Sequence, residues 1–266
     1  MPLVSIVIPT RNEAQNVAAL IQKIDRVFDP GTLYEIDFID DSTDNGATLH
    51  AIEAARIHAT RGNVRAFHRA VSNGLSGAIL DGIHGARSSL IIVMDGDGQH
   101  PPELLPAILQ SLIIGNELVI PTRYGQGAPG FSGPLMRRVL SRGARALGRA
   151  MVPALERSTD PASGFFGLHK HVVEDARIEP RGWKLLADIL ALGHYVSLDE
   201  IPYTFLERMS GKSNLGLSAH VDYLRQLWAL RRASKTSAHA RLDWATVHKE
   251  TRTPDVRPTR GRGRAL

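Results

Sequence analysis

The residues best suited to chemistry lie in one stretch, residues 91–105, with the sequence IIVMDGDGQHPPELL. Its apolar start has the length of a buried strand, and Asp95, Asp97 and Gln99 follow at every second position. Carboxylate and amide oxygens are hard ligands of the kind that Mg²⁺ and Mn²⁺ prefer. We therefore predict a divalent metal site that holds a phosphorylated ligand. The alternative is a plain acidic turn between a strand and a helix.

Polar residues also follow other predicted strands. A β-branched run at residues 4–8 is followed by PTRNE, and a second run at residues 34–39 is followed by two aspartates. Thr10 or Asn12 is expected to cap the helix that starts near Glu13. The carboxyl ends of strands in an open α/β sheet form one crevice, where ligands bind. Four carboxylates are expected to converge there: Glu13, Asp41, Asp95 and Asp97.

Strands and helices alternate along the first half of the chain, which predicts an α/β fold with a mostly parallel, mixed sheet flanked by helices. The predicted strands are 4–8, 34–39, 64–67, 91–94 and 118–121. The predicted helices are 13–24, 47–59, one that follows the glycine-rich turn 73–78 and runs to about residue 87, and 102–114. Farther along, we expect a helix at 134–151, a turn and short apolar segment at 160–166, a helix at 183–192, a strand region at 196–205 and an amphipathic helix at 217–233.

Composition restricts the class of protein. The 266 residues are 43% hydrophobic, enough for one domain with a buried core. The absence of cysteine excludes disulfides, thiolate zinc sites and cysteine nucleophiles. The N-terminus lacks a basic leader and is expected to be a strand rather than a secretory signal. Because no uninterrupted apolar run reaches about 18 residues, we expect no transmembrane helix.

The basic excess is confined to the C-terminal end. Residues 1–206 carry 19 basic and 22 acidic side chains, whereas residues 207–266 carry 13 and 5. Such an end can meet anionic lipid, nucleic acid or only water. No helix-turn-helix, zinc or RNP motif accompanies it, so we do not expect a nucleic-acid-binding module. We predict a catalytic domain at 1–215, an amphipathic, membrane-surface helix at 216–235 and a disordered basic tail at 236–266.

An ordered series of motifs resembles the dolichol-phosphate mannosyltransferase and polyprenol-phosphate glycosyltransferase branch of the family 2 glycosyltransferases. The segment PTRNE is similar to the family's PTYNE, IDDSTD to its VDDGSPD and MDGDGQHPPE to its DADLQHPPE. TRY, RRVLSRGA, DPASGF and EIPYTFLERMSGKS complete the series, which spans about residues 3–215. The resemblance implies a GT-A fold, a nucleoside diphosphate sugar donor, Mg²⁺ or Mn²⁺, and a polyprenyl phosphate acceptor.

The resemblance also implies roles for individual residues. The nucleotide would be held by Pro9, Arg11, Glu13, Ile39, Asp41, Asp95, Gly96 and Asp97, and the metal by Asp95, Asp97 and Gln99. The acceptor phosphate would meet Arg123, Arg137 and Ser141, and the catalytic residues would be Asp97, Arg123, Arg137 and Arg208. These transfers make chemical sense, because guanidinium groups match phosphate oxygens in two-point contacts.

The chain departs from the family pattern at five positions. Arg11 replaces a tyrosine that would stack on the base, and Phe166 stands where an arginine is usual. Asn214 replaces a lysine that would neutralise diphosphate charge, with Lys212 nearby as a substitute. Gly96 and Gly98 replace alanine and leucine.

The resemblance implies inverting transfer of a hexose, with mannose from GDP-mannose as the first choice, onto a polyprenyl or dolichyl phosphate. Such an acceptor is already an oxyanion and needs no general base, whereas a sugar hydroxyl would need one, with Asp160 as the first candidate. We expect a peripheral protein on the cytoplasmic membrane face, with a membrane-anchored partner protein. The alternatives are transfer to a saccharide or small molecule, and a degenerate, non-catalytic partner subunit.

Overall fold

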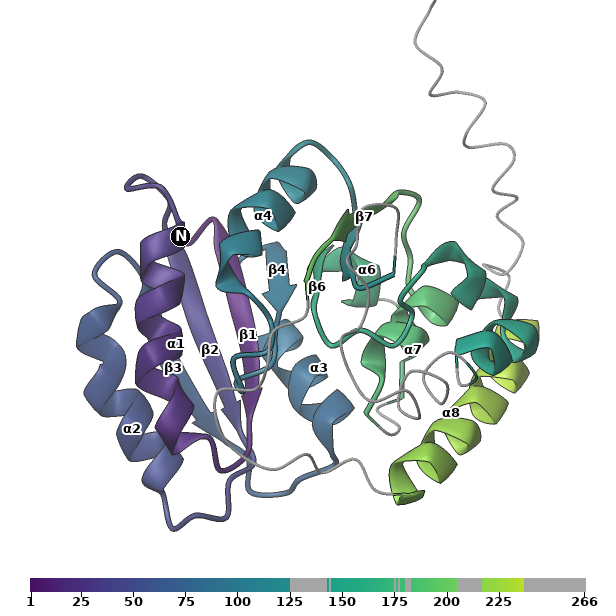
Figure 1. The fold of residues 1–266 in the computed structure, drawn as a ribbon, viewed down its shortest axis with the longest axis horizontal. Helices are drawn as coiled ribbons and strands as arrows, with labels where there is room; N and C mark the ends of the chain where they lie inside the picture. Colours follow the sequence, from purple (N-terminus) through teal and green to yellow (C-terminus); the bar gives the residue numbers. More distant parts are fainter. Residues whose placement is uncertain are drawn as a thin grey trace, which may run out of the picture.

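The computed structural model describes residues 1–124, 143, 145–174, 176, 178–179, 183–204 and 217–236. Within them, seven strands form one sheet in the order β3-β2-β1-β4-β6-β5-β7 (Figure 1). The strands are β1 Val4–Thr10, β2 Tyr34–Asp40, β3 Asn63–His68, β4 Leu90–Val93, β5 Leu118–Thr122, β6 Phe166–His169 and β7 Leu198–Pro202. Only β6 runs antiparallel to its neighbours, which confirms the predicted α/β fold with a mostly parallel, mixed sheet.

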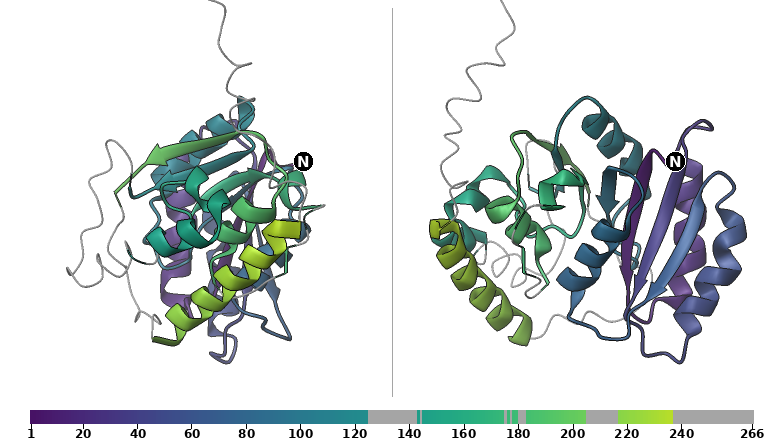
Figure 2. Two further views of the ribbon diagram at one scale, coloured as in Figure 1. Left: turned by 90° about the vertical axis from the view of Figure 1, so that its right-hand side faces the viewer. Right: turned by 180° about the vertical axis from the view of Figure 1, so that it is seen from behind.

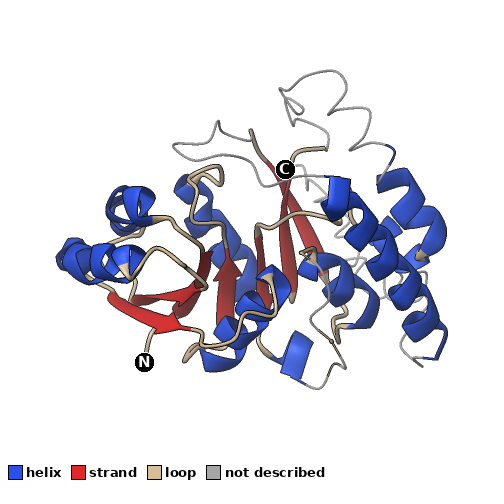
Figure 3. Cartoon of the chain, turned by 90° about the horizontal axis from the view of Figure 1, so that it is seen from below, coloured by secondary structure: helices blue, strands red, loops and turns tan. Residues whose placement is uncertain are grey.

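Helices cover both faces of the sheet (Figure 3). The helices are α1 Ala14–Val27, α2 Ala47–Ala55, α3 Leu75–Gly85, α4 Leu105–Ile113, α6 His171–Glu174, α7 Leu185–Leu192 and α8 Leu217–Thr236, with 3₁₀ turns η1 Arg56–His58, η2 Pro102–Leu104 and η3 Pro153–Arg157. Side chains from α1, α2 and α4 pack in one core with alternate residues of β1 and β2. The other core joins α3, α7 and α8 on the opposite face. This alternation is the two-residue period of strands buried on both sides.

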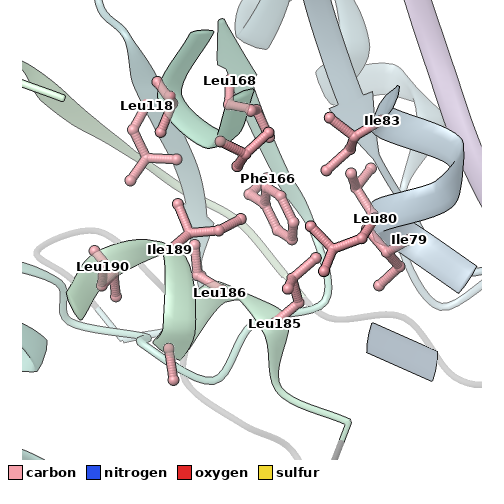
Figure 4. Close-up of a cluster of buried hydrophobic side chains, with 14 of the residues drawn as sticks. Ile79, Leu80, Ile83, Leu118, Phe166, Leu168, Leu185, Leu186, Ile189 and Leu190 are labelled. Atoms are coloured by element: carbon pink, nitrogen blue, oxygen red, sulfur yellow. The ribbon is translucent and has the colours of Figure 1, made fainter. Parts of the chain in front are cut away.

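Phe166 lies in the second core. It is fully buried at the start of β6, pairs with Val93 of β4 and lies among Leu80, Leu185 and neighbouring aliphatic side chains (Figure 4). Phe166, which stands where the family usually has an arginine, is therefore a residue of the hydrophobic core. A charged side chain here would have to be buried without water, which costs several kcal/mol.

Most predicted elements that fall on the described residues agree with the structure to within a few residues, but the predicted helix caps are wrong. Thr10 donates its hydroxyl to Asp40, and the Asn12 side chain accepts from the backbone of Thr43, so neither caps α1. The predicted helix 47–59 ends earlier, at Ala55, and continues as η1. The strand region 196–205 contains a shorter strand, β7. Most of the predicted helix 134–151 lies outside the described residues.

The C-terminal end of the described chain is α8, which lies along one end of the molecule (Figure 2). It matches the predicted amphipathic helix, and the predicted basic tail lies almost wholly outside the described residues. Among the described helices, none is both long and apolar enough to cross a membrane.

Candidate active site

The carboxyl end of β1 lies between the ends of β2 and β4. The backbone N–H of Asp41 donates to the carbonyl of Thr10 at 2.9 Å. On the other side, a Cβ added to Gly96 would lie 3.3 Å from Cγ2 of Thr10, so the turn after β4 is in close contact with the end of β1. The residues that follow β2 and those that follow β4 therefore line the same edge of the sheet, as the strand pattern predicts.

The turn after β4 is held by two side chains. His100 Nδ1 accepts from the backbone N–H of Asp95 at 3.0 Å, and Asp97 Oδ1 accepts from the backbone N–H of Gln99 at 3.0 Å. Gly98 has a φ of 77°, in the left-handed region that glycine adopts without strain. The glycine that replaces the family's leucine thus suits the backbone conformation of this turn.

His100 is a site residue that the sequence analysis missed, although it directly follows Gln99. It is buried and stacks on Phe165 with ring centroids 4.9 Å apart. Burial lowers the pKa of His100 to about 3, so the imidazole is neutral at physiological pH. Because Nδ1 accepts the Asp95 N–H, the ring proton is on Nε2, 3.6 Å from Asp95 Oδ2. The ring therefore fixes the position of Asp95.

The carboxylates of this turn fit a divalent metal whose remaining ligands come from a phosphate and water. Asp97 is buried, whereas the Asp95 side chain is 36% exposed. A Cβ at Gly164 would lie 3.2 Å from both Asp95 oxygens, so glycine leaves room for this carboxylate. Within the described residues no three His, Asp or Glu side chains are grouped to hold a metal alone. Mg²⁺ typically takes one or two carboxylates and completes its shell with phosphate oxygens and water.

Arg123 and Asp160 form a buried ion pair next to this turn. Arg123 Nε donates to Asp160 Oδ2 at 2.7 Å, and Nη2 donates to Oδ1 at 2.9 Å. Burial alone would lower the pKa of Arg123, but the charge and hydrogen bonds of Asp160 outweigh it and raise the pKa above its usual value. The guanidinium is therefore permanently charged and held in one orientation.

Lys184 and Tyr203 are two further residues that the sequence analysis missed. Lys184 Nζ donates to the carbonyl of Ala162 at 2.7 Å, and Tyr203 is buried with its ring edge against Phe165. Asp95, Asp160 and Arg123 all act electrostatically on both side chains. A lysine just before a helix and a tyrosine just after a strand carry no local signal of such a site.

Asp41 offers a hydrogen-bond acceptor at this edge of the sheet. Its Oδ2 accepts from Arg69 Nη1 at 2.9 Å and from Ser72 Oγ at 2.7 Å. Its Oδ1 is buried and has no hydrogen-bond partner among the described residues. A buried acceptor without a partner is costly, and a ligand N–H or O–H group would satisfy it.

The other residues predicted on the nucleotide side lie in different environments. Pro9 is buried in β1, Arg11 is exposed, and Glu13 accepts from the Asn16 side chain at 2.5 Å. The side chain of Ile39 packs in the core against Gly82, so only its backbone can face a nucleotide. Five residues of the predicted site lie outside the described residues: Arg137, Ser141, Arg208, Lys212 and Asn214.

The sequence is similar to known proteins over most of its length. Residues 5–176 match the model of Glycosyl transferase family 2. Over 227 residues the chain is 36% identical to a dolichol-phosphate mannosyltransferase of Pyrococcus furiosus, covering 85% of this chain and 63% of that protein. It is 34% identical over 243 residues to the dolichol-phosphate mannosyltransferase of Mycosarcoma maydis, covering 87% and 80%.

Solved structures share the fold. A glucosyl-3-phosphoglycerate synthase from Mycobacterium tuberculosis, in complex with Mn²⁺, UDP-glucose and phosphoglyceric acid, matches with a TM-score of 0.61 and 18% identity. The match covers 88% of this chain and 79% of that one, and it supports the GT-A fold. From the family model, the curated relatives and the fold together, the chain belongs to glycosyl transferase family 2.

Proposed function

We propose that this protein transfers mannose from GDP-mannose to the phosphate of a polyprenyl or dolichyl lipid, with inversion at the anomeric carbon. The names of its relatives support this choice of sugar and acceptor. The chain covers less than two thirds of the Pyrococcus protein, so the assignment also needs support from its own residues.

The observation that carries the proposal is the pairing of Asp160 with Arg123. This carboxylate is the candidate base for a hydroxyl acceptor, and both of its oxygens accept hydrogen bonds from Arg123. The guanidinium therefore engages both oxygens of the carboxylate, an arrangement that orients a cation. A phosphate monoester, whose second pKa is about 6, needs no base at neutral pH because it is already an oxyanion. The geometry therefore favours a phosphate acceptor over a sugar hydroxyl.

The donor would lie along the edge formed by β1, β2 and β4. Asp41 would accept from the nucleoside through Oδ1, and Asp95 and Asp97, with Gln99, would hold Mg²⁺ or Mn²⁺ against the diphosphate. When bound, the metal supplies positive charge for the leaving diphosphate. His100 would hold the backbone of Asp95 for this role, and Gly164 leaves room for its carboxylate.

The transfer itself is a displacement. An acceptor phosphate oxygen forms the new bond to the anomeric carbon while the bond to the diphosphate oxygen breaks, and its electron pair leaves with the nucleoside diphosphate. Arg123, fixed by Asp160, would hold the acceptor phosphate and stabilise developing charge. Arg137, Ser141 and Arg208 are proposed to act with it, as the family resemblance implies.

The protein would meet its lipid at a membrane surface through α8. Tyr223, Leu227 and Leu230 are buried, whereas Leu224 and Trp228 are 44% and 53% exposed on another face of the helix. That face also presents three exposed arginines, Arg225, Arg231 and Arg232. The guanidinium of Arg232 lies 3.5 Å from the Trp228 ring centroid. Aromatic and basic side chains together suit an anionic lipid surface. The cytoplasmic face and a membrane-anchored partner stay predictions.

A donor comparison tests the proposed activity. The purified full chain is incubated with polyprenyl phosphate, Mg²⁺ and either radiolabelled GDP-mannose or radiolabelled UDP-glucose, and label is counted in the organic phase. We expect label from GDP-mannose. Label from UDP-glucose alone would show that the sugar is wrong, and no label from either donor would favour a non-catalytic subunit.

A further inference from the structure

Lys184 is a second basic side chain beside Arg123, and the proposed mechanism does not yet use it. Its ammonium donates to the carbonyl of Ala162, which lies in the tight turn that begins at Asp160. It also lies 3.9 Å from the ring centroid of Trp183. These contacts hold the ammonium next to the Arg123–Asp160 pair.

The two carboxylates that act electrostatically on Lys184 have other roles. Asp160 is already paired with Arg123, and Asp95 is reserved for the metal in the proposed function. Within the described residues, the hydrogen-bond acceptor of the ammonium is a neutral carbonyl. Burial, together with the charge of Arg123, lowers the pKa of Lys184 to about 8, although the charges of Asp160 and Asp95 act to raise it. A bound anion would remove this penalty.

The backbone of Lys184 is fixed from α8. Gln226 Nε2 donates to the Lys184 carbonyl at 3.1 Å and to Asp188 Oδ2 at 2.5 Å. Gln226 and Asp188 are 2% and 3% exposed, so this polar link is inside the protein. The helix proposed to lie on the membrane is therefore hydrogen-bonded to the residue that carries the second cation.

We propose that Lys184 binds a phosphate oxygen of the substrates and that Gln226 is its positioning residue. The inference rests on the proposed function, because it concerns the phosphate groups of that reaction. The two sources of this oxygen are the diphosphate of the donor and the phosphate of the lipid acceptor. Lys184 would then supply a positive charge like that of the lysine which Asn214 replaces.

Three substitutions at position 184 separate charge from structure. Lys184→Met removes the charge and keeps most of the length, Lys184→Gln keeps a donor without charge, and Lys184→Arg keeps the charge. Lys170→Met is the matched control, because Lys170 also donates to backbone carbonyls, at 2.9 and 3.0 Å, away from the site. Urea unfolding checks that each variant is folded.

Two measurements locate the phosphate. Calorimetry gives the affinity for GDP in the presence of Mn²⁺, and steady-state assays give the KM for polyprenyl phosphate. We expect Lys184→Met and Lys184→Gln to weaken one of these about tenfold or more, which is about 1.4 kcal/mol, and Lys184→Arg to recover most of it. A loss in GDP affinity assigns Lys184 to the donor, and a rise in KM assigns it to the acceptor.

The proposal fails if both constants stay within about twofold of the wild-type values, or if Lys184→Arg is as weak as Lys184→Met. GDP binding requires no transfer, so wild-type protein that binds GDP but makes no lipid product would contradict the proposed function alone. The role of Gln226 is tested by a double-mutant cycle with Gln226→Leu. If the losses of the two single variants add in the double variant, this role is overturned. If Gln226 acts by positioning Lys184, Gln226→Leu causes little further loss once Lys184 is replaced.

Discussion

Arg123 donates to both carboxylate oxygens of Asp160, at 2.7 Å from Nε and 2.9 Å from Nη2. The two residues are 37 positions apart in the sequence, and Asp160 is 2% exposed. In this arrangement the carboxylate holds the guanidinium in one orientation. The proposal of a phosphate acceptor in place of a hydroxyl acceptor depends on this pair.

Replacing Asp160 by asparagine tests its positioning role. We expect kcat/KM for the lipid acceptor to fall about tenfold to 100-fold, since the guanidinium loses one of its two charged hydrogen bonds. GDP affinity and the pH profile of kcat above pH 6 should stay as in the wild type. Asp199→Asn is the control, because Asp199 accepts from Ser111 in a different part of the sheet. A variant that loses turnover completely, with a changed pH profile, would identify Asp160 as a base.

Replacing Asp97 by asparagine tests the metal site. Asparagine can still accept the Gln99 N–H, so the turn should survive, but a neutral amide binds a divalent cation weakly. We expect turnover to fall at least about 100-fold, or about 2.7 kcal/mol, and GDP affinity to lose its dependence on Mn²⁺. Asp29→Asn, at an exposed loop, should leave both unchanged. Normal Mn²⁺-dependent turnover by the Asp97 variant would rule out this ligand.

Phe166 should matter for stability and not for catalysis. Phe166→Ala is expected to lower the free energy of unfolding by about 3–5 kcal/mol, and Phe166→Arg by more, because the ring is fully buried (Figure 4). Urea denaturation measures this, with Ile57→Ala as the control at a side chain that is 78% exposed. A folded, more active Phe166→Arg variant would mean that this position belongs to the site.

The exposed face of α8 should determine lipid binding. We expect Trp228→Glu to reduce partitioning onto vesicles of phosphatidylcholine with about one third phosphatidylserine by about tenfold, or about 1.4 kcal/mol. Val71→Glu changes an apolar, 79% exposed side chain elsewhere and should have no such effect. Flotation of the full chain with vesicles compares the two. Equal partitioning of both variants would place the lipid contact elsewhere.

Asp25 should make stability depend on acid pH. Burial alone would raise its pKa, but hydrogen bonds from Tyr34 at 2.5 Å and Thr60 at 2.7 Å, together with Arg61, lower it below 3.8. A lowered pKa adds stability above the unfolded value, and this stability is lost as pH falls through the folded value. Asp25→Asn should therefore cost about 1–3 kcal/mol from pH 5 to 8, and less below about pH 4. A difference independent of pH would refute this.

The sequence predicts the first five strands and their helices well because the signals are local. Apolar runs such as residues 91–94 end at polar or proline residues, and the next helix repeats its apolar positions every three or four residues. The strand β6 is different. Its four residues carry no strand signal, and its antiparallel place between β4 and β5 depends on pairing with distant segments.

The same division applies to the site. The acidic residues of the predicted crevice follow strand ends, so topology alone brings Asp41 near the Asp95 turn. The contacts of Arg123 with Asp160, and of Lys184 with Ala162, join segments more than twenty residues apart. The spacing of apolar residues along the sequence does not predict such long-range contacts. The helix caps failed for a related reason, because Thr10 and Asn12 bond to the end of β2 instead of to α1.

The most direct test of phosphate transfer compares two acceptors that differ by one group. Purified protein receives radiolabelled GDP-mannose and Mg²⁺ with either polyprenyl phosphate or the matching polyprenol, and lipid-linked label is measured over time. We expect rapid labelling of polyprenyl phosphate and none of polyprenol, because the candidate base, Asp160, is paired with Arg123 through both of its oxygens. Comparable labelling of polyprenol would contradict this expectation.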